Sequence, residues 1–164
     1  GIRDVERSRG IGDVYKRQVG DGPNKEHCEE VVRELGLTDR VQFLGARGDI
    51  SELIARAYIG VQSSIWEGFG LTAVELMAAH KPVVATNVDG LKQVVEGAGC
   101  LFEVGDTKTL AFHINEMLRN KCLYTTLANQ CYERAKYYDI SRMAVCYQKV
   151  YEELFAHKRL EIIR

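Results

Sequence analysis

The sequence lacks several features that whole classes of protein depend on. Its 22 basic and 23 acidic side chains give a net charge of −1, so the excess of positive charge that marks nucleic-acid binding is missing. No apolar run approaches the roughly eighteen residues that span a bilayer, and the start has no apolar signal-peptide core. We therefore expect a cytoplasmic protein that binds no nucleic acid.

Patterns that bind metals or form disulfides are missing too. The five cysteines form no Cys-x-x-Cys pair, and the four histidines are scattered without the spacing of metal ligands. This predicts reduced cysteines and no metal site. A short basic tail over 157–164 is interleaved with apolar residues. It permits peripheral contact with the inner face of an anionic membrane, although a frayed helix end is the favoured interpretation.

What the sequence does contain is an alternation of strand-like and helix-like segments. With 164 residues and 46% hydrophobic content, one well-buried domain over 19–156 is expected. Short connections between the segments predict an α/β fold, a Rossmann-like parallel sheet flanked by helices, and a run of helices follows Gly105. The helical spacing predicts that these last helices bury Leu110, Ile114, Met117, Leu118, Leu127, Cys131, Ala135, Met143, Cys146, Tyr147, Val150, Tyr151 and Leu154.

The first 18 residues do not fit this alternation. They are rich in Arg, Asp, Gly and Lys, and they show neither helical nor strand periodicity. We expect residues 1–18 to be disordered or a non-native leader, since the stretch from Gly10 to Gln18 looks like a translated adapter.

The chain is organised around the stretch from Ser63 to Ala79. It has the pattern of a strand end, a glycine loop and a helix start, a geometry that directs free N–H groups and a helix dipole at an anion. Glu67 lies in the loop and Glu75 about two turns later, among apolar helix neighbours. We expect an inward-turned Glu75 that needs hydrogen-bond donors, such as the hydroxyls of a ribose. An ordinary surface glutamate is the competing interpretation.

The spacing of Glu67 and Glu75, with Gly68-Phe69-Gly70 after the first, resembles the Glu-x7-Glu signature of family 4 glycosyltransferases. These are retaining enzymes of the GT-B fold that transfer a sugar from a nucleotide donor. The resemblance covers most of the chain, from Val19 to Leu154. It includes blocks such as Val19-Gly20-Asp21-Gly22-Pro23, Val41-Gln42-Phe43-Leu44-Gly45, Asn87-Val88-Asp89-Gly90 and Gly99-Cys100-Leu101-Phe102.

The resemblance implies a role for each residue of the motif. Glu75 would accept hydrogen bonds from the ribose, and Glu67 would face the donor sugar as the catalytic-site residue. Gly68 and the N–H groups of Phe69, Gly70 and Leu71 would bind the distal phosphate. Ala46 and Arg47 would lie beside the base. The donor would be a UDP-, GDP- or ADP-sugar, transferred to an unknown acceptor without a metal or other cofactor.

The sequence departs from the family pattern at several points. His80 stands where a glycine usually ends the helix, but histidine tolerates the left-handed conformation better than most residues. Leu76 stands where a small residue is usual. The family's Arg and Lys for the diphosphate and its N-terminal acceptor-binding domain have no counterpart, so we expect a donor-binding C-terminal half that is inactive alone. The alternatives are a GT-B nucleotide-sugar epimerase and a receiver-like signalling module using Asp21 or Asp89.

Overall fold

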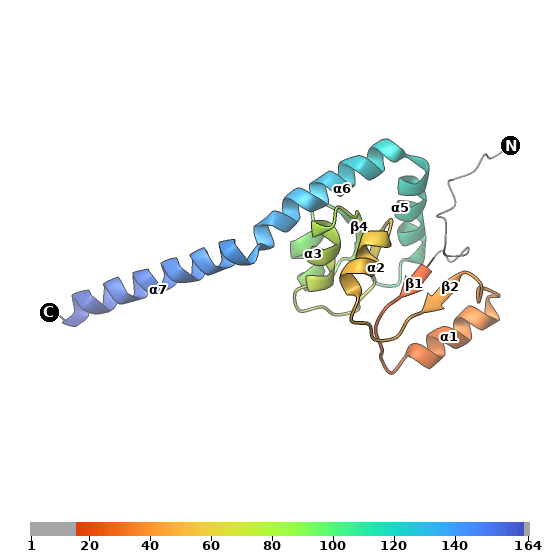
Figure 1. Ribbon diagram of the computed structural model, residues 1–164, viewed down its shortest axis with the longest axis horizontal. Helices are drawn as coiled ribbons and strands as arrows, with labels where there is room; N and C mark the ends of the chain where they lie inside the picture. Colours follow the sequence, from red (N-terminus) through yellow and green to blue (C-terminus); the bar gives the residue numbers. More distant parts are fainter. Residues whose placement is uncertain (1–15, 163–164) are drawn as a thin grey trace. The chain divides into compact units, whose positions relative to one another are not determined.

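The computed structural model describes the backbone of residues 16–162 and the side chains of residues 16–155 (Figure 1). The chain divides into two compact units, one ending at Ile50 and one beginning at Ser51, and each is described by itself. The alternation of strands and helices in the sequence had predicted a single domain over 19–156. All buried residues in the described part of the chain belong to the second unit, so the hydrophobic core is built from that unit alone.

The first unit contains two short parallel strands and one helix. β1 (Lys16–Gln18) pairs with β2 (Val41–Phe43), and α1 (Lys25–Glu34) connects the two strands. β1 corrects the expectation that disorder extends to Gln18, while residues 1–15 of that segment lie outside the described residues. The pattern of apolar residues could not predict this strand. Its side chains are polar and none is buried, so backbone pairing with β2 defines it.

The second unit is built on a three-stranded parallel sheet, which follows α2 (Ile50–Arg56). β3 (Gly60–Gln62), β4 (Val83–Thr86) and β5 (Cys100–Phe102) lie in the order β3-β4-β5. All four residues of the central strand β4 are buried. This is the burial expected of a short, continuous apolar run in a parallel sheet that is covered on both faces.

Helices connect the strands of this sheet and pack against it. Val84 and Phe102 of the sheet form a core cluster with Met117, which comes from the helix that follows β5. The expected α/β class, with parallel strands flanked by helices and a run of helices at the end, is confirmed. The helices of this part are α3 (Leu71–Ala78), α4 (Asp89–Val95), α5 (Thr107–Arg119) and α6 (Lys121–Ala135).

The chain continues through η1 (Lys136–Tyr138) into the long helix α7 (Ile140–Ile162), blue in Figure 1. Helix α7 includes most of the tail expected at 157–164. Every α7 side chain that the structure describes is exposed. The predicted burial is therefore wrong for this helix, because helical spacing identifies an apolar face but not what covers it. The residues corrected are Leu118 of α5, and Met143, Cys146, Tyr147, Val150, Tyr151 and Leu154 of α7.

Between residues 16 and 162, no helix combines the length and the apolar content that a transmembrane segment needs.

Candidate functional site

The loop over 63–70, between β3 and α3, is held at the carboxyl ends of two neighbouring strands. Thr86 at the end of β4 donates its hydroxyl to the carbonyl oxygen of Ser64, at 2.6 Å. Gln62 at the end of β3 donates its side-chain amide to Glu67 Oε2, at 3.2 Å. The sheet therefore orients the Glu67 carboxylate at the edge where open parallel sheets bind ligands.

Helix α3 begins at a glycine in the left-handed region. Gly70 has φ +91°, and a Cβ there would lie 2.8 Å from Leu91 Cδ2, so a side chain would be both strained and crowded. No side chain caps α3, and no described residue accepts a hydrogen bond from the N–H of Phe69, Gly70 or Leu71. The Phe69 ring lies edge-on to Tyr138, with centroids 5.4 Å apart. These free N–H groups and the helix dipole suit an anion.

Glu75 lies on the exposed face of α3, which corrects the expectation that it turns inward. Its apolar helix neighbours Leu71 and Ala78 are exposed as well, so apolar neighbours on the helix did not mean that Glu75 is buried. The Glu75 carboxylate makes no hydrogen bond or ion pair with the described residues. It stands four residues, about 6 Å, along the helix from its first residue. The side chain is therefore available to a ligand that lies over the start of α3. The buried face consists of Ala73, Leu76 and Met77.

The end of α3 keeps its cap although a histidine replaces the usual glycine. His80 has φ +56°, its N–H donates to the Met77 carbonyl at 3.0 Å, and the Lys81 N–H donates to Leu76 at 3.0 Å. These are the two hydrogen bonds of a Schellman motif. The His80 ring stacks on Tyr132 of α6, with centroids 3.6 Å apart. His80 was expected to tolerate the left-handed conformation and so to weaken the cap rather than abolish it, and the cap is present.

A pocket of about 300 Å³ opens beside the loop. It is formed by two stretches of chain, the loop after β3 and the turn that leads into α4. Apolar side chains and two carboxylates line it, so it combines an apolar wall with hydrogen-bond acceptors. The lining residues are Ile65, Trp66, Glu67, Val88 and Asp89.

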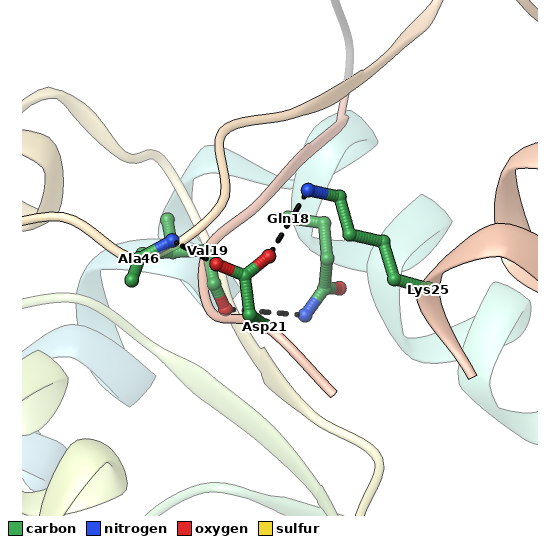
Figure 2. A network of polar contacts seen from close by, with 5 residues as sticks. All are labelled: Gln18, Val19, Asp21, Lys25 and Ala46. Atoms are coloured by element: carbon green, nitrogen blue, oxygen red, sulfur yellow. Dashed lines mark hydrogen bonds and ion pairs between the residues drawn. The ribbon is translucent and has the colours of Figure 1, made fainter. Parts of the chain in front are cut away.

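In the first unit, Ala46 and Arg47 follow β2 and are tied to acidic side chains. Figure 2 shows the Asp21 carboxylate between the Lys25 ammonium and the N–H of Ala46, each at 3.0 Å. The hydrogen bond from Lys25, and then that from Ala46, lowers the pKa of Asp21 below its ordinary value. Arg47 donates two parallel hydrogen bonds to Asp49, at 2.8 and 2.7 Å. Both predicted residues are thus held in defined positions within their unit.

The residues that support this site were not predicted from the sequence. Gln62 and Thr86 were not singled out, although each is a polar residue at the carboxyl end of an otherwise apolar strand, a position that favours contact with a neighbouring loop. Asp21 was named in the block from Val19 to Pro23 and as a candidate signalling aspartate, but its hydrogen bond from the Ala46 N–H was not predicted. Among the described residues, no three His, Cys, Asp or Glu side chains gather as ligands of a metal ion.

The parallel sheet of the second unit, with a glycine loop and a helix start at the carboxyl ends of its strands, defines a Rossmann-like ligand-binding unit. The model of the family described as Glycosyl transferases group 1 matches residues 3–120, more than half of the chain. The chain belongs to this family. The match begins within the segment that the sequence analysis set aside as a leader.

Individual relatives agree with this assignment. The N-acetyl-alpha-D-glucosaminyl L-malate synthase of Bacillus anthracis is 34% identical over 117 residues, which are 70% of this chain and 31% of the relative. Sucrose-phosphate synthase from Thermosynechococcus elongatus superposes with a TM-score of 0.76 at 31% identity, over 86% of this chain and 38% of that one. Anabaena HepE in complex with UDP superposes with a TM-score of 0.76 at 31% identity, over 87% and 41%.

A further structure of HepE is in complex with UDP-glucose and superposes with a TM-score of 0.74. This chain spans between 31% and 41% of the length of these relatives.

Proposed function

We propose that this chain is the donor-binding part of a retaining, family 4 glycosyltransferase of the GT-B fold. It binds a nucleotide-diphosphate sugar, whose sugar the whole enzyme transfers to an acceptor in polysaccharide or glycoconjugate synthesis. The observation that carries the proposal is one loop and helix that present Glu67, Glu75 and three free backbone N–H groups together. Membership of the family, and the UDP and UDP-glucose named for the similar HepE structures, support it.

The diphosphate would lie at the start of α3. The N–H groups of Phe69, Gly70 and Leu71 would donate to the distal phosphate, and Gly68 leaves the approach to them open. Because these donors are fixed by the backbone, they would also stabilise the charge that builds on the leaving diphosphate during transfer. Backbone amides would then do what a divalent cation does in other transferases, so we propose a reaction without metal or cofactor.

The two glutamates would bind rather than act as an acid and base pair. Glu75 would accept hydrogen bonds from the ribose hydroxyls, since its exposed carboxylate has no partner among the described residues. Glu67 would bind the donor sugar, with its carboxylate oriented by the amide of Gln62. A carboxylate that is held in place loses little conformational entropy when it accepts a hydroxyl.

For Ala46 and Arg47, which belong to the first unit, the role beside the base that the family resemblance implies stays a prediction. Because the N–H of Ala46 already donates to Asp21, its carbonyl oxygen is the group left to accept from a base edge. The proposal includes UDP, GDP and ADP sugars as donors, with UDP favoured by the named complexes of HepE. Acceptor binding is assigned to a part of the enzyme outside this sequence, so the chain alone is proposed to bind donor without transferring it.

The proposal is tested by measuring how much UDP, GDP and ADP each raise the thermal unfolding temperature of the chain, since a ligand that binds the folded state stabilises it. We expect one nucleotide to stabilise the chain, and Glu75→Gln to weaken its binding by about ten- to a hundredfold, since a hydrogen bond to a charged group contributes roughly 1.5–3 kcal/mol. The matched control is Glu153→Gln, which neutralises an exposed glutamate on α7. Failure of all three nucleotides to stabilise the chain would contradict the proposal.

A second comparison tests the ribose contact itself. Removal of the 2′-hydroxyl, in 2′-deoxy-UDP, should weaken binding to the wild-type chain but have little further effect on Glu75→Gln. Equal losses in both proteins would show that Glu75 does not contact the ribose. Sugar transfer by this chain without any added protein would contradict the proposal that the chain alone binds the donor but does not transfer the sugar.

A further inference from the structure

The pocket lined by Glu67 and Asp89 contains two carboxylates, and the proposed function gives a role to Glu67 alone. Its walls bring together carboxylates from two elements, Glu67 from the loop after β3 and Asp89 from the first residue of α4. The two segments are in direct contact, because a Cβ on Gly90 would lie 2.2 Å from the Glu67 carbonyl oxygen. Asp89 is thus held beside Glu67 by backbone packing.

No positive side chain balances these two carboxylates within the pocket. Asp89 is exposed and makes no hydrogen bond or ion pair with the residues that the structure describes. Glu67 accepts a hydrogen bond from the neutral amide of Gln62. Lys92, one turn further along α4, does not line the pocket. Its Nζ lies 3.9 Å from Glu96 Oε1, with which it forms an ion pair. A ligand that enters the pocket therefore meets two negative charges.

We propose that Asp89 is a specificity-determining residue that, together with Glu67, restricts the donor to sugars without a negative charge. This inference rests on the proposed function, since it takes the pocket as the place of the donor sugar. Carboxylates accept hydrogen bonds from hydroxyl or amino groups, so neutral hexoses and amino sugars fit the pocket. The carboxylate of a uronic acid would stand against both Glu67 and Asp89, and like charges at such distances repel.

Size and wall chemistry agree with a sugar ring. A volume of about 300 Å³ is at the small end of the range for ligand pockets, which suits one monosaccharide rather than an extended chain. Trp66 and Val88 supply an apolar wall against which the C–H face of the ring can pack. Trp66 is also the one tryptophan of the sequence, so its fluorescence reports on this pocket.

The experiment titrates the full chain separately with UDP, UDP-glucose and UDP-glucuronate. Trp66 fluorescence is the signal that reports binding. We expect the wild-type chain to bind UDP-glucose about tenfold more tightly than UDP-glucuronate. Asp89→Asn keeps the size of the side chain but removes its charge, and it should reduce that preference to about two- or threefold. Its affinity for UDP alone should not change, because UDP lacks the donor hexose that would enter the pocket.

The matched control is Glu96→Gln, which removes a negative charge from the end of α4 outside the pocket and should keep the tenfold preference. Equal binding of the two donors by the wild-type chain would overturn the inference, as would an unchanged preference in Asp89→Asn. Either result, with UDP bound, leaves the proposed function standing. If GDP or ADP binds in place of UDP, the same comparison is made between the neutral and the uronate sugar of that nucleotide. If none of the three nucleotides binds, the proposed function fails and this inference fails with it.

Discussion

The carbonyl oxygen of Glu67 lies against the backbone of Gly90, 2.2 Å from the point at which a Cβ on that glycine would stand. The approach is possible because glycine has no side chain, and Gly90 is buried in the first turn of α4. Backbone packing against α4 therefore holds the loop on one side. Hydrogen bonds from Gln62 of β3 and Thr86 of β4 hold it on the side of the strands. The loop that carries the candidate site is held on two sides by the unit to which it belongs.

Gly90→Ala should displace this loop. A methyl group has no room beside Glu67 without a shift of backbone, so we expect a loss of about 1–3 kcal/mol in the free energy of unfolding. Nucleotide binding should fall further than stability alone explains, because the loop carries the N–H groups that we propose bind the phosphate. Urea unfolding and a UDP titration on the same protein measure the two effects. Gly22→Ala is the control, since nothing lies within 4 Å of its added methyl group.

Leu76 and Gly60 form a second close pair, between α3 and β3. A Cβ on Gly60 would lie 2.6 Å from Leu76 Cδ1, so the large residue found where the family has a small one is matched by a glycine opposite it. Gly60→Ala should cost about 1–3 kcal/mol and Leu76→Ala about 2–4 kcal/mol of unfolding free energy. The double variant should cost clearly less than the sum, because Leu76→Ala makes room for the new methyl group. Strict additivity in urea unfolding would show that the two sites do not interact.

Local rules predicted much of the fold and located the site. The strand, glycine loop and helix around Glu67 were predicted from one stretch of sequence, since glycine and the change from strand to helical spacing are local signals. The tolerance of His80 for the left-handed conformation was predicted from a local rule as well. Asp106 caps α5 by accepting from the Thr109 N–H at 3.0 Å, and His80 closes α3 in the left-handed conformation.

What the sequence could not predict depends on neighbours distant in the chain. Glu75 was expected to turn inward because its helix neighbours are apolar, but whether an apolar face is covered depends on other elements. The same reason explains the exposed apolar residues of α7. β1 was missed because its strand form depends on pairing with β2, and the support of Glu67 by Gln62 depends on how the loop folds back over β3.

His80 offers a test of how strain and stacking balance at the end of α3. His80→Gly removes the strain of a positive φ, about 1 kcal/mol, but also the stack on Tyr132, which contributes about 0.5–1.5 kcal/mol. We expect a net change close to zero. His80→Ala keeps the strain and loses the stack, so it should be less stable than His80→Gly by about 1 kcal/mol. Thermal unfolding measures both variants.

Tyr132→Leu provides the control for this pair. Without the tyrosine ring, His80→Gly no longer sacrifices a stacking contact, so the glycine should stabilise the Tyr132→Leu protein by about 1 kcal/mol. If glycine has the same effect in both backgrounds, the stack between His80 and Tyr132 contributes nothing to stability.

Asp106 should make the stability of α5 depend on pH. Its carboxylate accepts from the Thr109 hydroxyl at 2.6 Å and from the Thr109 N–H at 3.0 Å, and these hydrogen bonds lower its pKa below the ordinary value of 3.8. A carboxyl group with a lowered pKa in the folded state contributes stability that is fully present above its unfolded pKa. That contribution is lost as the pH falls through the folded value.

Asp106→Asn isolates this effect, because asparagine can cap the helix but does not titrate. We expect the wild-type chain to be more stable than the variant near neutral pH, and the difference to shrink as the pH falls from 3.8 downwards. Urea unfolding midpoints of both proteins, measured over a pH series, give this difference directly. The other aspartates with lowered pKa values, such as Asp21 and Asp139, are common to both proteins and cancel. A difference that stays constant across the series would mean that the Asp106 charge makes no contribution to the cap.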